Sequence, residues 1–389
     1  LRHARITRLL GSEIAADEIT DILQRLEMEV SKEGEDWQVT PPSFRFDIAL
    51  EADLIEEVAR VHGYNRLPTR AQHVPAQIAA QSESQLEMQR LREVLLQRGY
   101  SEAVTYSFVD ADLQQRINPD AVAVDVDNPI AEQYAQMRTT LWSSLLPAWQ
   151  HNSRRQESRV RLFEFGLRFE RDAQAQLGIA QRLTCAGLIS GSAAPEHWNN
   201  AKRDVDLFDI KGHVEALFAA SSSAGSISFK ASAHPALHTG RCAQLLLGHM
   251  PIGWLGQLHP KFKDAYGNKE LPYVFELDCE HLLQANVPRV AAVSEFPWIR
   301  RDLAVVVPEA INAGDLQQSL LSQNSEYLQS VNVFDVFRGQ DLEAGFKSIA
   351  LGLIYQDKTS TLTDKGVDDA VTKLTAHLGE RYGAKVRGQ

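Results

Sequence analysis

The C-terminal quarter of the chain shows an order of strand-like and helix-like segments that few folds accept. The apolar patterns predict strands at 302–307, 328–338, 347–356 and 384–387, and helices at 313–321 and 364–378. Pro308 would end the first strand, and Asn312 suits the N-cap of the helix that follows. The order β-α-β-β-α-β is that of the ferredoxin-like fold, which RNA-recognition modules share. We therefore predict a ferredoxin-like (RRM-like) domain at 294–389.

Strand alternation in this domain predicts which side chains the sheet leaves open. The alternating apolar residues of the third strand are Ile349, Leu351 and Leu353. They should face the helices, and by the same rule Phe334 and Val336 would join the core. Asp335 and Phe337 would then share the open face with Ser348. An exposed aromatic ring on an open sheet suits the stacking of RNA bases, whereas the alternative is that another domain covers Phe337.

The first block combines two helical patterns with a hairpin-like stretch and contains a cluster of carboxylates. Helices are predicted at 14–28 and 49–61, and the hairpin at 29–40. The carboxylates are Asp47, Asp53, Glu56 and Glu57. At about 100° per residue the last three share one side of their helix, and Mg²⁺ accepts such oxygen ligands. The alternative is an N-cap at Asp47 followed by a solvated acidic face that suits the helix dipole.

The middle block mixes strands and helices without a regular βαβ rhythm. A helix is predicted at 86–97, and strands at 159–169, 184–189, 243–247 and 274–277. This pattern favours an antiparallel sheet flanked by helices. A segment rich in Ala, Gln, Ser and Pro separates this block from the first and is interpreted as a linker. The predicted division is a domain at 1–69, a linker at 70–84, a middle module at 85–293 and a last domain at 294–389, in an α+β multidomain chain.

Composition and charge narrow the possible classes of function. The 389 residues have a formal net charge of −11, which disfavours a protein that coats nucleic acid through a broad basic field. No apolar run approaches the roughly 18 residues that a membrane-spanning helix needs, so no membrane contact is expected. Cys185, Cys242 and Cys279 are scattered, which favours a reducing, cytoplasmic compartment. The chain begins at Leu1 without a signal-like segment, so we expect a fragment or a processed product.

Outside the acidic cluster and the open face, the sequence offers no self-contained active site. It contains no CxxC pair and no HExxH, P-loop or GxSxG motif. His234 and His238 are interpreted as structural, because no third metal ligand is evident. A run of arginines could bind a phosphate backbone. We prefer the interpretation that these arginines form a solvated helix end before a buried strand. These arginines are Arg154, Arg155, Arg159 and Arg161.

Several separated stretches together resemble one family, in the family's order. They are Arg45-Phe46-Asp47 with 53–64, then 127–129, 137–141, 161–166, 208–212 and 255–260, and finally 296–304 with 334–339. The first pair is similar to the B5 domain of bacterial phenylalanyl-tRNA synthetase beta subunits. The middle group is similar to their catalytic-like module, and the last pair to their anticodon-binding domain. The resemblance covers essentially the whole chain and implies the C-terminal half of such a subunit.

The resemblance implies site residues and partners for the chain. Mg²⁺ would be held by Asp47, Asp53, Glu56 and Glu57 at the contact with the alpha subunit. Asp335, Phe337 and Ser348 would contact the anticodon of tRNA(Phe). Some family members have Tyr at the position of Phe337. Stacking would be kept with either residue, whereas a hydrogen bond from the Tyr hydroxyl would be lost with Phe.

The resemblance also implies a fold and a division of labour between subunits. It implies a winged-helix-like first domain and an inactive class II synthetase-like middle module. ATP-dependent aminoacylation would take place on the alpha subunit of an alpha2-beta2 heterotetramer. The OB-fold and editing half of the family is missing from the sequence, so this chain would not proofread tyrosine.

Two other classes of function remain as alternatives. A metal-dependent phosphodiester hydrolase would use the carboxylates between Asp47 and Glu57 around an open cleft, although no general base is evident nearby. A free-standing RNA-binding or regulatory protein would have inherited the architecture without the partner. Assembly with an alpha subunit would distinguish this last class from a subunit of the synthetase.

Overall fold

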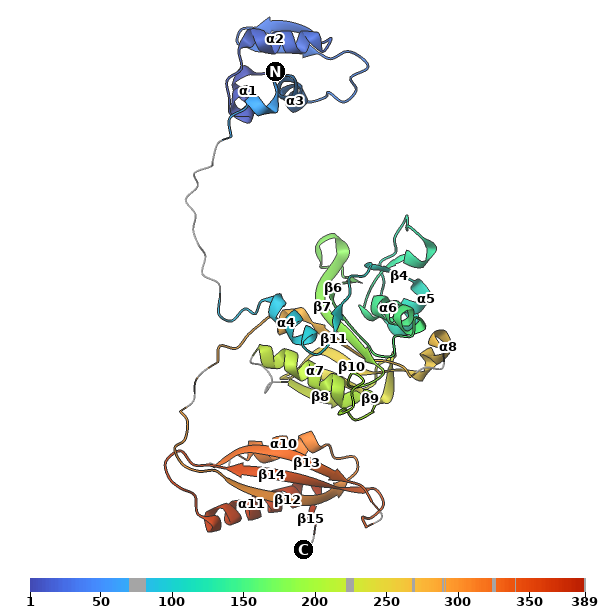
Figure 1. Ribbon diagram of the computed structural model, residues 1–389, viewed down its shortest axis with the longest axis vertical. Coiled ribbons are helices and arrows are strands. Elements are labelled where there is room, and N and C mark those ends of the chain that lie inside the picture. The colour runs from blue at the N-terminus through green and yellow to red at the C-terminus, as the bar shows by residue number, and fades with distance from the viewer. Residues whose placement is uncertain are drawn as a thin grey trace. The chain divides into compact units, whose positions relative to one another are not determined.

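The computed structural model describes residues 1–69, 82–221, 227–267, 270–288, 290, 292–323, 327–339 and 341–387. The chain divides into two compact units, Leu1–Gln81 and Ser82–Gln389 (Figure 1). Positions 70–81 of the predicted linker lie outside the described residues. Within the described ranges, no helix is both long and apolar enough to cross a membrane.

The first unit packs three helices and a β-hairpin around one apolar core. Its elements are α1 (His3–Leu10), α2 (Ala16–Arg25), β1 (Glu29–Glu33), β2 (Asp36–Thr40), α3 (Glu51–His62) and the short turn η1 (Tyr64–Arg66). Ile6, Leu23 and Val58, one from each helix, are fully buried. Trp37 of β2 is buried with them, and its indole N–H donates to the Thr20 hydroxyl at 2.9 Å. Three helices with a hairpin wing confirm the winged-helix-like prediction, although helix α1 has no counterpart among the predicted segments.

The second unit contains a seven-stranded sheet with the spatial order β3-β6-β7-β11-β10-β9-β8. Its strands are β3 (Ser101–Glu102), β6 (Val160–Arg171), β7 (Ile179–Ser190), β8 (Ile227–Ala231), β9 (Leu237–Leu247), β10 (Met250–Leu258) and β11 (Tyr273–Asp278). Only the short pair of β3 and β6 is parallel among these neighbours. The sheet is therefore essentially antiparallel, as the sequence pattern predicts.

Helices and short elements surround this sheet (Figure 1). The longer helices are α4 (Met88–Leu96), α5 (Ala111–Ile117), α6 (Trp142–Arg154) and α7 (Leu207–Ala220). The short elements are β4 (Phe108–Val109), β5 (Gln136–Met137), α8 (Lys263–Tyr266), α9 (Cys279–Leu282), η2 (Glu132–Tyr134), η3 (Gln176–Gly178) and η5 (Pro260–Phe262). Residues of α4 and α7 pack with Phe163 and Phe275 in one core. Residues of α6 pack with Leu188 and Val274 in a second core.

His234 belongs to the second of these cores. Its ring lies edge-on to Trp142 and Trp254, with centroid distances of 5.2 and 5.0 Å. The Nδ1 atom accepts the amide N–H of Ala236 at 3.1 Å, and burial lowers the pKa of His234 to about 4. The ring is therefore held neutral by packing and hydrogen bonding, in agreement with a structural role.

A buried ion pair between Arg138 and Glu164 links the sheet to the segment before α6. One Arg138 nitrogen donates to Glu164 at 2.9 Å and to the Thr105 hydroxyl at 3.0 Å. The Arg138 Nε atom donates to the carbonyl of Leu167 at 2.9 Å. The pair is almost fully buried, with side-chain exposures of 3% and 5%. Gly166 makes room for it, because a Cβ at that position would collide with the Arg138 guanidinium.

The last part of the second unit is a four-stranded antiparallel sheet with the order β13-β14-β12-β15. Its elements are β12 (Ile299–Pro308), α10 (Ala313–Ser322), β13 (Leu328–Phe337), β14 (Phe346–Tyr355), α11 (Asp364–Tyr382) and β15 (Lys385–Val386). Apolar residues of β12 and β14 form one core with α10 and α11. The element order and the single covered face confirm the ferredoxin-like prediction.

Replacing Arg138 by Met should destabilise the middle module by about 3–5 kcal/mol, because Glu164 would remain buried without its cationic partner. Hydrogen exchange of peptides from β6, recorded over a series of urea concentrations, measures the change in the free energy of unfolding. Arg92→Met is the matched control, since its pair with Glu102 is about one third exposed and should contribute at most about 1 kcal/mol. Equal effects of the two substitutions would contradict the role of the buried pair.

Candidate functional site: the open face of the last sheet and the acidic cluster

Cross-strand pairing determines which side chains lie on the open face of the last sheet. Asp335 pairs with Ala350 and Phe337 pairs with Ser348. Ile349, which lies between Ala350 and Ser348 on β14, is buried in the core with α10 and α11. Side chains alternate along a strand, so Asp335, Phe337 and Ser348 share the face away from the helices. The structure thus brings together the three residues that were predicted as anticodon contacts.

Phe334 contradicts the predicted pattern. It was expected in the core, but 52% of its surface is exposed. The register slips by one residue between Val333 and Asp335, which breaks strict alternation at this point. Val336 still pairs with Ile349 on the helix side, although 39% of it is exposed. The prediction that Phe334 and Val336 join the core is therefore wrong, since neither belongs to the apolar cluster with α10 and α11.

Phe337 is half-buried and has a cationic neighbour. The Cζ atom of Arg387 lies over its ring, 4.5 Å from the centroid. The ring also lies against Gly339, where a Cβ would collide with it. Ser348, across from Phe337, is only 3% exposed. Arg387 was not predicted as a site residue, because a contact between β13 and the end of the chain has no local sequence signal.

The Asp335 carboxylate is an exposed acceptor on this face. The residue is solvent-exposed, and among the described residues it has no hydrogen bond or ion pair. It lies two residues from Phe337 on the same side of β13. A carboxylate beside an aromatic ring can accept hydrogen bonds from the edge of a base that stacks on the ring.

The acidic cluster of the first unit is organised around arginines. Arg45 makes two hydrogen bonds to Asp47, at 3.0 and 2.7 Å, and a third to Glu57 at 3.2 Å. Arg60 also binds Glu57, at 2.6 Å. The Asp53 carboxylate accepts the backbone N–H groups of residues 49 and 50 at the start of α3. Sequence reasoning named the carboxylates but missed Arg45, although it stands inside the same motif.

These contacts change the pKa values of two of the carboxylates. The hydrogen bond from Arg45 lowers the pKa of Asp47. Arg60, followed by Arg45, lowers the pKa of Glu57 despite its burial. Both side chains are therefore held as anions by guanidinium groups.

The arrangement does not fit a bound Mg²⁺ ion in this chain by itself. Asp47 and Glu57 share a guanidinium, Asp53 caps a helix, and Glu56 is exposed. Within the described part of the chain, no three His, Cys, Asp or Glu side chains are placed to hold a metal ion. This placement also disfavours the phosphodiester hydrolase, which needs several carboxylates around an open cleft.

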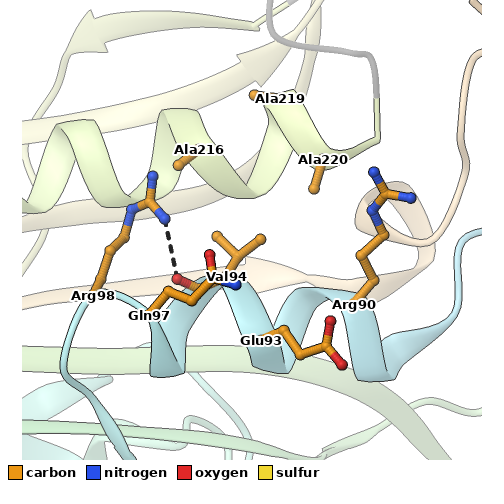
Figure 2. Close-up of a pocket in the computed structure, with 8 residues that line it drawn as sticks. All are labelled: Arg90, Glu93, Val94, Gln97, Arg98, Ala216, Ala219 and Ala220. Atoms are coloured by element: carbon orange, nitrogen blue, oxygen red, sulfur yellow. Dashed lines mark hydrogen bonds between the residues drawn. The ribbon is translucent and has the colours of Figure 1, made fainter.

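The middle module contains a hollow of about 440 Å³ between α4 and α7. Figure 2 shows Arg98 and Arg90 of the α4 side at opposite ends of this hollow, facing alanines of α7. Arg98 donates to the carbonyl of Val94 at 3.1 Å. Arg161 is buried nearby and donates to the carbonyls of Arg98 and Ala193. Arg98 and Arg161 thus bind carbonyl groups of the chain's own backbone.

Comparisons with known proteins assign all three parts of the chain. The family model "Phenylalanyl tRNA synthetase beta chain CLM domain" matches residues 67–279. The model "tRNA synthetase B5 domain" matches residues 1–64, and "Ferredoxin-fold anticodon binding domain" matches residues 294–387. The matches follow one another along the chain without overlap.

Curated relatives match over the whole chain. The phenylalanine–tRNA ligase beta subunit of Methylococcus capsulatus is 45% identical over 388 residues, which cover 100% of this chain and 48% of the relative. The corresponding subunit of Dickeya dadantii is 40% identical over 387 residues and is covered to 49%. The chain thus spans about half the length of these relatives. A solved pyrrolysyl-tRNA synthetase from Desulfitobacterium hafniense matches 50% of this chain and 66% of its own at 16% identity, and its TM-score of 0.36 is too low to support an argument.

Replacing Arg45 by Gln should raise the pKa of Asp47 toward its ordinary value, because the hydrogen bonds that favour the anion are lost. Glu57 should change less, since Arg60 remains. Carboxyl ¹³C chemical shifts followed over a pH titration measure both groups. Arg60→Gln is the reciprocal control and should mainly raise the pKa of Glu57. An Asp47 titration that is unaltered in Arg45→Gln would show that the ion pair does not persist in solution.

Proposed function

The chain belongs to the phenylalanyl-tRNA synthetase beta-chain family, and from this premise we propose that it acts as the C-terminal half of the beta subunit of phenylalanine–tRNA ligase. The complete enzyme uses ATP to join phenylalanine to tRNA(Phe). This chain supports the catalytic alpha subunit and binds the tRNA anticodon, and the chemistry takes place on the alpha subunit. The assembly that we propose contains two alpha and two beta chains and is cytoplasmic.

Two buried arginines of the middle module support a scaffolding role. Nucleotide sites need cationic donors that can reach phosphate oxygens. Arg138 is buried against Glu164, and Arg161 is buried against main-chain carbonyls. Both side chains stabilise the module and are not available to phosphates. This supports a synthetase-like module that contributes structure rather than adenylate formation.

The open face of the last sheet is the observation on which the RNA-binding proposal rests. Phe337 presents a ring, Arg387 presents a guanidinium at 4.5 Å from it, and Asp335 presents an exposed carboxylate. Unpaired bases are recognised by stacking on aromatic and guanidinium planes and by hydrogen bonds at their edges. We propose that Phe337 stacks an anticodon base, that Asp335 accepts from the edge of a base, and that the Ser348 hydroxyl is a third contact.

Mg²⁺ at the contact with the alpha subunit is proposed only for the assembled enzyme. Asp47, Asp53, Glu56 and Glu57 are its proposed ligands, and the ion would bring their charges together. In the chain by itself, Arg45 is hydrogen-bonded to both Asp47 and Glu57. Arg45 would have to release them first, and no other element of the proposal depends on the ion.

The loop before α3 supports a contact with another protein. Phe44, Phe46 and Leu50 are exposed by 60%, 93% and 67%. Large apolar side chains grouped on one short loop indicate an interaction surface. Their position beside the acidic cluster agrees with a partner that meets both features.

Mixing this chain with a phenylalanyl-tRNA synthetase alpha subunit should give a stable mixed complex, because the apolar loop loses its exposure on assembly. Light scattering after gel filtration measures the mass, with and without Mg²⁺. Phe46→Ser should weaken assembly, whereas Leu9→Ser, at a residue 55% exposed on α1, should not. A chain that stays monomeric beside the alpha subunit would favour the free-standing RNA-binding or regulatory protein.

Phe337→Ala should weaken the binding of tRNA(Phe) by about 1–3 kcal/mol, the usual loss when an aromatic stacking partner is removed. Fluorescence anisotropy of labelled tRNA at fixed salt concentration measures the dissociation constant. Phe337→Tyr keeps the ring and should bind nearly as well as the wild type. Binding that is indifferent both to Phe337→Ala and to changed anticodon bases would exclude this site.

A further inference from the structure

Phe334 reaches the open face through an irregularity in its strand. Val333 pairs with Leu351, whereas Asp335 pairs with Ala350. Two steps along β13 thus correspond to one step along β14, and Phe334 is the extra residue of a β-bulge. Bulges turn side chains away from the direction that alternation dictates. The ring of Phe334 is half-exposed as a result.

Arg300 confirms the face on which this ring lies. The Arg300 Cζ atom is 5.3 Å from the centroid of the Phe334 ring. The same guanidinium lies over Gly352, 3.2 Å from the point where a Cβ would stand. Since both neighbours of Gly352 on β14 are buried under the helices, Gly352 faces the open side. Arg300 and Phe334 therefore meet on the same face as Phe337.

The guanidinium of Arg300 has a fixed orientation. Its Nε atom donates to the Asp302 carboxylate at 2.7 Å, from the next residue of β12 on the same side. Both members of this ion pair are about half exposed, so the pair is accessible to a ligand. A side chain larger than glycine at Gly352 would push the guanidinium off the sheet.

The open face thus repeats one arrangement of an aromatic ring and an arginine. Phe337 has Arg387 at 4.5 Å, and Phe334 has Arg300 at 5.3 Å. The two rings are three residues apart on β13, which at about 3.3 Å per residue is roughly 7–10 Å. A single exposed aromatic residue on a surface is ordinary. Two rings on one open sheet face, each next to a guanidinium, match the way sheet-based modules stack successive bases.

We propose that Phe334 and Arg300 form a second stacking position for an RNA base, beside the position at Phe337. This inference rests on the proposed anticodon function and extends it from one base to two adjacent unstacked bases of the same loop. Stacking tolerates any base, so Phe334 and Arg300 contribute affinity. Asp335, which lies between the two rings in sequence, contributes discrimination through base edges.

The test uses the full chain and an anticodon stem-loop RNA with a fluorescent base analogue at one of two adjacent loop positions. Phe334→Ala should weaken binding roughly 5- to 150-fold and restore fluorescence at one position. Phe337→Ala should restore fluorescence at the other. Phe334→Tyr keeps a stacking ring and should bind like the wild type, whereas Phe334→Leu keeps only apolar bulk and should not. Val336→Ala, on the opposite side of the same strand, is the matched control.

The outcomes separate this inference from the anticodon function itself. If Phe337→Ala weakens binding while Phe334→Ala leaves both affinity and fluorescence unchanged, the second position is wrong and the first remains. If the wild-type chain binds neither the stem-loop nor tRNA(Phe), the anticodon function fails. Because Phe334 is half-exposed, Phe334→Ala should fold normally, which hydrogen exchange of β13 and β14 verifies.

Discussion

Burial of one side of β14 determines what the last sheet presents to solvent. Ile349, Leu351 and Leu353 are fully buried in the core with α10 and α11, and each such side chain contributes about 1.5–3 kcal/mol. A slip by one residue would expose all of them at once, so the register is fixed. The residues between them are then forced to the open side. Because Ala350 and Gly352 are small, that side has room for rings and guanidinium groups.

In the first unit, Arg45 binds two of the carboxylates that the family resemblance implies as Mg²⁺ ligands. Arg45 joins Asp47 to Glu57 by three hydrogen bonds and so ties the loop to α3. Bidentate contacts of this kind combine charge with directional geometry. They leave the loop's phenylalanines exposed. The loop therefore has a fixed connection to α3 while its large apolar side chains stay on the surface.

The parts of the fold that could be predicted from the sequence are those in which apolar residues recur in a regular local pattern. The order of elements in the last domain was predictable because its strands alternate and its helices have apolar faces. Helix α1 was not, since it is only eight residues long and Ile6 is its only buried residue. The error at Phe334 has a different cause. A bulge shifts the alternation by one residue, and only the partner strand shows where the shift occurs. Arg387 was missed because its contact with Phe337 spans fifty positions along the chain.

The net charge of −11 imposes a condition on any RNA contact of this chain. A long phosphate track gains affinity from many cations, and the excess of acidic over basic residues disfavours a broad basic surface of that kind. Its open face instead has two guanidinium groups, each placed against a ring. Stacking and directed hydrogen bonds depend less on salt than counterion release does. Such a surface suits the stacking of a few unpaired bases.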